Sequence, residues 1–289
     1  MLEISPSREV NQRPQGDTGA DAFTPSYHRE MLMDDRRVKA FKKAIDYYGD
    51  PKLTFMEFGI GTGVMSAHAA TRFGHVYAVE RDPFIYSIAK SNLSKLGLLD
   101  KQITLIHADV LEADLPQVDV VMAELLSTLM IHEPEVPALN RATRELLKPD
   151  GVVIPQTVIN TVTPAWSKYA AHDVSFTSPY TLFTGVPLPE AVGETKVFYA
   201  ADFMSGEVAN KVSVQTDVLC MLESEINSLV LNSNIQLAPG VTFAGSDSLN
   251  PAMVVPIEPV YVTAGQTITI KLEYDHFSDW QSFKASIIS

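Results

Sequence analysis

Two glutamates, Glu124 and Glu133, stand nine residues apart in the segment AELLSTLMIHE, directly after the apolar run VDVVM. Such a run is typical of a buried strand of a parallel sheet, and open α/β sheets bind ligands at the carboxyl ends of their strands. Two carboxylates there suit a cationic, forked substrate, above all a guanidinium, which offers parallel N–H donors. We therefore predict that both act on a guanidino group, the alternative being two solvated loop acids.

A glycine-rich turn precedes these acids and reads EFGIGTG, beginning at Glu57. Glycine adopts positive φ and allows a backbone to approach a ligand, so Gly59, Gly61 and Gly63 predict a turn around a nucleotide-like cofactor. The spacing G-x-G-x-G lacks the third glycine position of nicotinamide-binding turns.

Acids also end the next two predicted strands. Glu80 ends VYAVE, where a carboxylate binds both ribose hydroxyls, and Asp109 ends ITLIHAD, near the expected adenine edge. Nicotinamide and S-adenosylmethionine sites share this set of acids. Together with the glycine spacing, it favours S-adenosylmethionine.

The elements that must position these residues alternate between strand and helix over residues 53–155. Apolar runs predict strands at 54–58, 75–80, 103–109, 118–124 and 151–154. Helical periodicity predicts helices at 62–73, 83–96 and 138–147. Such alternation is typical of a Rossmann-like, doubly wound and mostly parallel sheet.

One more helix is predicted ahead of the sheet, at residues 30–48. Its apolar stripe consists of Met31, Val38, Phe41, Ile45 and Tyr48. Asp34 falls within this stripe. Because an acid on a buried face usually has a partner or a function, Asp34 is a candidate site residue.

The pattern changes after Pro155. β-rich runs at 196–203, 211–219, 228–237, 254–262 and 267–274 are separated by turn signals, which predicts an antiparallel, β-barrel-like domain. We therefore expect a flexible arm at 1–26, a cofactor domain at 27–155 and a substrate domain at 156–289.

Composition narrows the function classes. The chain has 289 residues and a net charge of −13, which argues against non-specific nucleic-acid binding. No run reaches transmembrane length, no signal peptide is recognisable, and no zinc-type Cys/His spacing predicts a metal site. The single cysteine, Cys220, fits a cytoplasmic protein and is expected to pack in a strand.

These residues resemble a known family, the class I S-adenosylmethionine-dependent methyltransferases, and within them the protein arginine methyltransferases. The family's H-x-x-M-L-x-D-x-x-R helix stands here as HREMLMDDRR, from His28 to Arg37, and its paired glutamates match Glu124 and Glu133. The resemblance implies that Arg37 binds the cofactor carboxylate and that Met31 lies near the sulfonium. It further places the glycines at the methionine portion, Glu80 at the ribose, and Asp109 and Val110 at the adenine.

The chain also departs from that family. The first glutamate is followed by LLST instead of Trp-Met-Gly-Tyr, and the Thr-His-Trp loop is replaced by DSLNP, from Asp247 to Pro251. Asp34, whose family counterpart pairs with that histidine, needs another partner. These changes favour a small guanidino substrate, with free arginine the leading candidate. Tyr27 and His132 are further candidates for the substrate pocket, although packing explains Tyr27 equally well and His132 can equally face solvent.

Other functions stay open at this point. They are a protein arginine methyltransferase, a small-molecule O-methyltransferase, a cofactor-binding regulatory module and, less compatible with the glycine spacing, a nicotinamide oxidoreductase. The family also implies a homodimer, for which residues 171–194 are a candidate arm.

Overall fold

The computed structural model describes residues 25–288, so the predicted arm at 1–26 lies outside the described residues except for its last two positions. Those two positions begin α1 (Pro25–Met33), which is followed by α2 (Asp35–Tyr48). The prediction of one helix over 30–48 is wrong. Asp34 breaks it, because its side chain accepts a hydrogen bond from the backbone N–H of Arg37 at 3.1 Å and caps α2.

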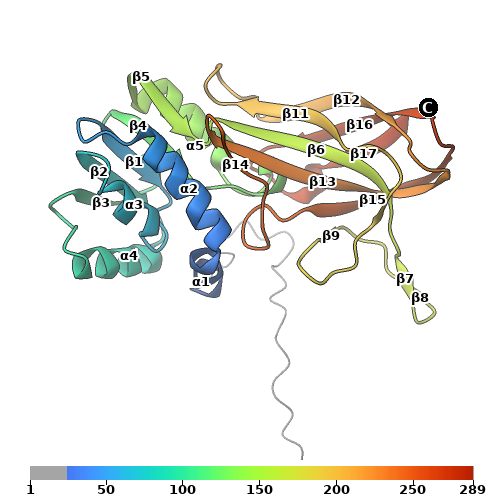
Figure 1. Cartoon of the computed structure of the whole chain (residues 1–289), viewed down its shortest axis with the longest axis horizontal. Coiled ribbons are helices and arrows are strands. Elements are labelled where there is room, and N and C mark those ends of the chain that lie inside the picture. The colour runs from blue at the N-terminus through green and yellow to red at the C-terminus, as the bar shows by residue number, and fades with distance from the viewer. Residues whose placement is uncertain (1–24, 289) are drawn as a thin grey trace, which may run out of the picture.

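A five-stranded parallel sheet forms the first half of the molecule, with the strand order β3-β2-β1-β4-β5 (Figure 1). Its strands are β1 (Thr54–Phe58), β2 (His75–Glu80), β3 (Ile103–His107), β4 (Val118–Ala123) and β5 (Leu147–Ile154). The connecting helices are α3 (Val64–Ala69), α4 (Pro83–Lys95) and α5 (Glu135–Arg141), which continues as a π-turn, Ala142–Leu146. The Rossmann-like fold is confirmed. The order in which strands are added to the sheet reverses between β1 and β4, and ligands of such sheets bind at this switch point.

Antiparallel strands make up the second half and divide mainly into a seven-stranded and a three-stranded sheet. The long strands are β6 (Thr157–Trp166), β11 (Lys196–Asp202), β12 (Lys211–Leu219), β13 (Ser224–Ala238), β15 (Met253–Val262), β16 (Thr267–Asp275) and β17 (Lys284–Ile288). The short strands are β7 (Ala170–Ala171), β8 (Val174–Ser175), β9 (Tyr180–Thr181), β10 (Glu190–Ala191) and β14 (Val241–Phe243).

Side chains of both antiparallel sheets form one core, which includes Cys220, as expected for a packing residue. The antiparallel second half is confirmed, whereas its closure into a barrel stays a prediction. So do the domain boundaries, although the change from parallel to antiparallel strands falls between Ile154 and Thr157.

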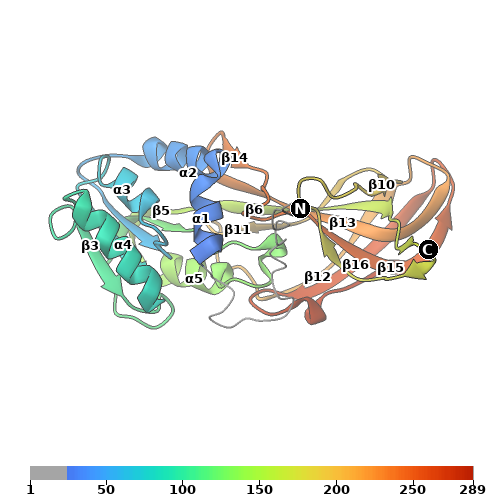
Figure 2. The same cartoon turned by 90° about the horizontal axis from the view of Figure 1, so that it is seen from below.

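Helices α1 and α2 lie where the two halves meet (Figures 1 and 2). Phe41 of α2 packs against Phe243 of β14, with ring centroids 6.4 Å apart. The first helices therefore fasten the antiparallel second half, residues 157–288, to the parallel sheet beside the switch point. We call this second half the β-region. Within residues 25–288, no helix is long and apolar enough to cross a membrane.

Candidate active site

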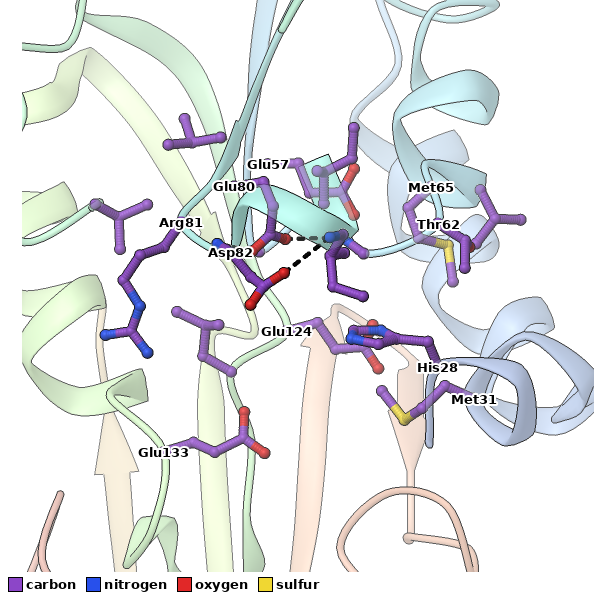
Figure 3. A pocket seen from close by; sticks show the side chains of 18 of the residues that line it. His28, Met31, Glu57, Thr62, Met65, Glu80, Arg81, Asp82, Glu124 and Glu133 are labelled. Atoms are coloured by element: carbon purple, nitrogen blue, oxygen red, sulfur yellow. Dashed lines mark hydrogen bonds between the residues drawn. The ribbon is translucent and has the colours of Figure 1, made fainter. Parts of the chain in front are cut away.

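A cavity of about 360 Å³ opens at the carboxyl ends of the parallel strands, and His28 and Met31 of α1 form part of its wall (Figure 3). Most of the predicted site residues line it: Tyr27, Met31, Arg37, Glu57, Gly59, Gly61, Glu80, Asp109, Val110, Glu124 and Glu133. Three predicted residues are not part of the lining: Asp34, Gly63 and His132.

The glycine turn joins β1 to α3. Gly59 has a φ of 71°, and a Cβ there would lie 2.8 Å from a methyl carbon of Leu125. Gly61 has a φ of 56°, and the nearest side-chain atom to a Cβ built there is Nδ1 of His28, at 3.6 Å. Side chains at these positions would strain the backbone or narrow the cavity, so the turn requires glycine.

Glu80 is held at the cavity wall by two backbone groups. Its carboxylate accepts hydrogen bonds from the N–H of Gly61 at 3.2 Å and of Asp82 at 2.9 Å. Burial raises the pKa of Glu80, while these bonds oppose the shift. The carboxylate is thus fixed beside the turn with acceptor capacity left for hydroxyl groups.

Asp82 itself is a lining residue that the sequence analysis missed. Its side chain caps α4 by accepting from the N–H of Phe84 and Ile85, at 2.9 and 2.8 Å. The dipeptide Asp82-Pro83, a capping residue before a proline at the first helical position, was the available signal.

Glu57 lies at the floor of the cavity and is 2% exposed. Burial raises its pKa to about 8, although the hydroxyl of Ser66 donates a hydrogen bond to it and opposes the shift. A pKa of about 8 favours the uncharged form of Glu57 at neutral pH. Glu124 and Glu133 are therefore the better candidates for binding a cation in this cavity.

Arg37 and Glu124 form a buried bidentate pair. Nε and Nη2 of Arg37 donate to the two carboxylate oxygens of Glu124, and Nη1 donates to the carbonyl oxygen of Met31 at 2.8 Å. Burial tends to lower the pKa of Arg37, but Glu124 raises it overall. Burial raises the pKa of Glu124, and Arg37 opposes that shift. The charged guanidinium favours the carboxylate form of Glu124 and fixes its orientation.

The segment between the two acids is held by the β-region. The N–H of Leu129 donates to Oγ of Ser233 at 2.8 Å, and the hydroxyl of Thr128 donates to the carbonyl oxygen of Pro251 at 2.7 Å. Oγ of Ser127 accepts from the N–H of Glu133 at 3.2 Å. Glu133, 8% exposed, lies with Glu124 toward one end of the cavity, away from Glu80 (Figure 3).

Asp34 is hydrogen-bonded to two serines, where the family pattern has a histidine as the partner. Its Oδ2 accepts hydrogen bonds from the hydroxyls of Ser246 and Ser248, the latter at 2.7 Å. These bonds lower the pKa of Asp34 overall, against the effect of burial. The two serines thus tie the β-region to the α1–α2 junction, a contact that the sequence analysis did not anticipate.

His132 is placed against Trp280, with ring centroids 6.2 Å apart, and its N–H donates to Oγ of Ser127 at 2.9 Å. The structure does not bring it into the cavity lining. Its contact with the substrate stays a prediction, whereas Tyr27 does line the cavity.

Comparisons with known proteins agree with this geometry. A family model described as a methyltransferase domain matches residues 55–151. An uncharacterised protein of Methanocaldococcus jannaschii is 30% identical over 269 residues, covering 91% of this chain and 97% of that protein. An arginine N(omega)-methyltransferase of Streptomyces achromogenes subsp. streptozoticus is 25% identical over 297 residues, covering 90% and 81%.

A solved structure shares the whole architecture. The PRMT1 enzyme-prozyme heterotetrameric complex of Trypanosoma brucei with AdoHcy superposes with a TM-score of 0.73 at 17% identity, covering 91% of this chain and 98% of that one. The chain carries a methyltransferase domain and is an S-adenosylmethionine-dependent methyltransferase of the class I type. It resembles the arginine methyltransferases of this type, and the cofactor of this methyltransferase is S-adenosylmethionine.

The cavity of the methyltransferase fits that cofactor. Nε2 of His28, in the cavity wall, is buried and has no hydrogen-bond partner among residues 25–288, as expected where a polar ligand supplies one. Arg37 uses three of its five N–H donors on Glu124 and Met31, so two are left for a carboxylate. The acceptor groups of Glu80 are available for hydroxyls at the other end.

Proposed function

We propose that this enzyme transfers a methyl group to a nitrogen of a small guanidino compound, with free arginine the leading candidate. Glu124 and Glu133 carry this proposal, because both are more than nine-tenths buried and line the same cavity as the glycine turn. Burying carboxylates is unfavourable unless cations and N–H donors meet them. A guanidinium supplies both in one planar group.

The cofactor is proposed to span the cavity from Glu80 to Arg37. Glu80 would accept from the ribose hydroxyls, and Asp109 and Val110 would adjoin the adenine. The two remaining N–H donors of Arg37 would bind the methionine carboxylate, with Met31 close to the sulfonium. Since Arg37 also holds Glu124, it would link the cofactor to the substrate anchor.

S-adenosylmethionine supplies an electrophilic methyl group on a sulfonium. Glu124, whose two oxygens already accept from Arg37, anchors the guanidinium through the second lone pair of each oxygen. Glu124 and Glu133 together draw positive charge away from the attacking nitrogen. Alignment of the two reactants lowers the barrier by about 7–11 kcal/mol. The methyl group would come from the sulfonium of the cofactor, and Glu133 would accept the proton that the methylated nitrogen releases and pass it to water.

A small substrate is favoured over an arginine in a protein for two reasons. The bonds of Ser246 and Ser248 to Asp34 close the junction beside α1, where the resembling family carries its Thr-His-Trp loop. The relative named an arginine N(omega)-methyltransferase also matches 90% of this chain, which includes the β-region. An oxygen nucleophile is disfavoured, because it would gain little from two buried anions.

A methyl-transfer assay tests the proposal. The enzyme would be incubated with S-adenosylmethionine and, separately, free arginine, agmatine, an arginine-rich peptide, a primary amine and a hydroxy acid, and product masses would be measured. We expect a mass increase of one methyl group on a small guanidino compound. Turnover of the peptide alone would indicate a protein substrate, and turnover of the hydroxy acid alone would overturn the guanidino proposal.

We also propose a homodimer formed through residues 171–194. Val174, Phe176 and Leu188 are 69%, 79% and 80% exposed, and the β7–β8 hairpin projects from the molecule (Figure 1). Large apolar side chains that are this exposed within one segment are candidates for burial at a protein interface. Light scattering should give a dimer mass for the wild type and a monomer mass for Phe176→Ser. A wild-type monomer at all concentrations would contradict the proposal.

A further inference from the structure

A third acid, Glu135, lies beside the two that line the cavity. It begins α5, is 0% exposed, and its Oε2 accepts a hydrogen bond from the backbone N–H of Leu125 at 3.0 Å. Leu125 directly follows Glu124 in the chain. Glu135 therefore connects the start of α5, just after Glu133, to the backbone just after Glu124.

The surroundings of Glu135 disfavour a charge. Its Oε1 has no hydrogen-bond partner within the described residues 25–288. Burial raises its pKa well above the ordinary value, the charges of Glu133 and Glu124 raise it further, and the N–H of Leu125 opposes the shift. Since an isolated buried carboxylate is strongly unfavourable, these surroundings favour the neutral carboxylic acid. As such it still accepts a hydrogen bond through its carbonyl oxygen.

The segment that Glu135 adjoins is under backbone strain. Leu129 and Met130, both without the freedom of glycine, have φ values of 58°. Such conformations cost on the order of 1–3 kcal/mol each and persist only where the surroundings hold them. The β-region holds the middle of the segment through Leu129, while the bond to Leu125 restrains its beginning.

We propose that Glu135 is a positioning residue of this active site: its buried carboxyl group accepts from the backbone N–H of Leu125 and keeps Glu124 in register with Glu133. This role rests on the proposed function, in which those two acids receive the substrate guanidinium. Glu135 does not line the cavity, so it acts through Glu124 and not on the substrate.

Two variants of Glu135 separate the hydrogen bond from the charge. Glu135→Gln keeps a carbonyl oxygen for the N–H of Leu125 and cannot ionise, whereas Glu135→Met keeps a similar length without a strong acceptor. Because the acceptor survives in Glu135→Gln, we expect its kcat to stay within about threefold of the wild type. Because small misplacements of reacting groups are costly, Glu135→Met should lower kcat by about 10- to 100-fold with unchanged cofactor affinity.

The result that would overturn the proposal is equally specific. If Glu135→Met keeps wild-type kcat, the bond to Leu125 does not position Glu124. If Glu135→Gln loses as much activity as Glu135→Met, the proton or charge of Glu135 is required, and the role as a neutral acceptor is wrong.

Two further readouts do not depend on the substrate. Hydrogen–deuterium exchange at the amide of Leu125 should accelerate in Glu135→Met and stay slow in Glu135→Gln. The melting temperature of Glu135→Gln should also rise relative to the wild type between about pH 5 and 8, because only the wild type keeps a carboxyl group neutral there. If Glu135→Met does not fold, Glu135→Gln decides alone. The proposal is overturned if the melting temperature of Glu135→Gln changes with pH in the same way as that of the wild type, or if the amide of Leu125 exchanges faster in this variant. A wild type that methylates no guanidino compound would instead refute the proposed function, while the exchange data still decide whether Glu135 holds the segment.

Discussion

The glycine turn and the acid segment lie in the same cavity but are held in different ways. The turn is fixed by its own backbone and by Glu80, which accepts from Gly61 only 19 residues earlier in the chain. The acid segment is fixed by Ser233, 104 residues away from Leu129, and by Pro251, 123 residues away from Thr128. The proposed cofactor site is thus built by local structure, whereas the proposed substrate site depends on how the β-region docks.

This difference separates two kinds of variant. Changes at the turn and its acids should weaken cofactor binding, whatever the substrate. Changes at the acid segment, or at its contacts with the β-region, should lower turnover with little effect on the cofactor. Glu124 is the exception, because Arg37 connects it to both functions.

Glu133→Gln should have the largest effect that is confined to catalysis. Loss of one carboxylate beside the guanidinium should lower kcat by about 10²- to 10³-fold, with cofactor affinity and melting temperature unchanged. Steady-state kinetics and calorimetry check this, with the exposed Glu112→Gln as the matched control. Wild-type turnover in Glu133→Gln would remove this acid from the mechanism.

Glu124→Gln should lose comparable activity and stability as well. The substitution leaves the buried guanidinium of Arg37 opposite a neutral amide, and breaking a buried ion pair costs about 3–5 kcal/mol. We therefore expect a lower melting temperature and weaker cofactor binding than in Glu133→Gln. If the two variants are equally stable, Arg37 does not depend on Glu124 in the way that the structure indicates.

Glu80→Ala should weaken cofactor binding and leave the binding of the guanidino substrate unchanged. Hydrogen bonds to a charged group contribute about 1.5–3 kcal/mol, so cofactor affinity should fall by roughly 10- to 100-fold. At saturating cofactor, KM for the guanidino substrate should not change. The exposed Asp114→Ala serves as the control, and an unchanged dissociation constant for Glu80→Ala would contradict the ribose assignment.

The double variant Ser246→Ala, Ser248→Ala tests the junction with the β-region. Asp34 would lose two donors that act across 212 and 214 residues, and we expect about 1–3 kcal/mol less stability and a lower kcat. Cofactor affinity should change little, because Asp34 does not line the cavity. Thermal unfolding and kinetics together check this, and unchanged stability would show that other contacts hold the junction.

Glu57→Gln should show its effect in the pH dependence of stability. Burial raises the pKa of Glu57 to about 8, whereas an unfolded glutamate has a pKa of about 4.3. Between these values the folded state binds a proton that the unfolded state lacks, so the stabilisation is complete below about pH 4.3 and lost as pH rises to about 8. Glu57→Gln lacks this loss. Between pH 5 and 8, the free energy of unfolding of Glu57→Gln should therefore rise relative to that of the wild type, by at most about 1.4 kcal/mol per pH unit. Its melting temperature should rise accordingly.

Much of the cofactor site was predictable because its signals are local. A strand, a glycine turn and a terminal acid are adjacent in sequence, and Gly59, Gly61 and Glu80 all line the cavity as expected. The break at Asp34 was not predicted, because its apolar neighbours continue the helical stripe on both sides. Only the cap that Asp34 forms to Arg37 shows that the helix ends.

The sequence by itself determined the parallel fold, the cofactor turn and the two candidate acids, because periodicity and strand ends are properties of consecutive residues. Only the tertiary structure decided that Arg37 pairs with Glu124, 87 residues away, and that two serines replace the histidine partner of Asp34. It likewise decided that Glu135 accepts a hydrogen bond from the N–H of Leu125. Those contacts depend on which strands are neighbours and on how closely the β-region approaches the first helices. No spacing along the chain encodes that approach, because it results from the packing of side chains from both halves at once.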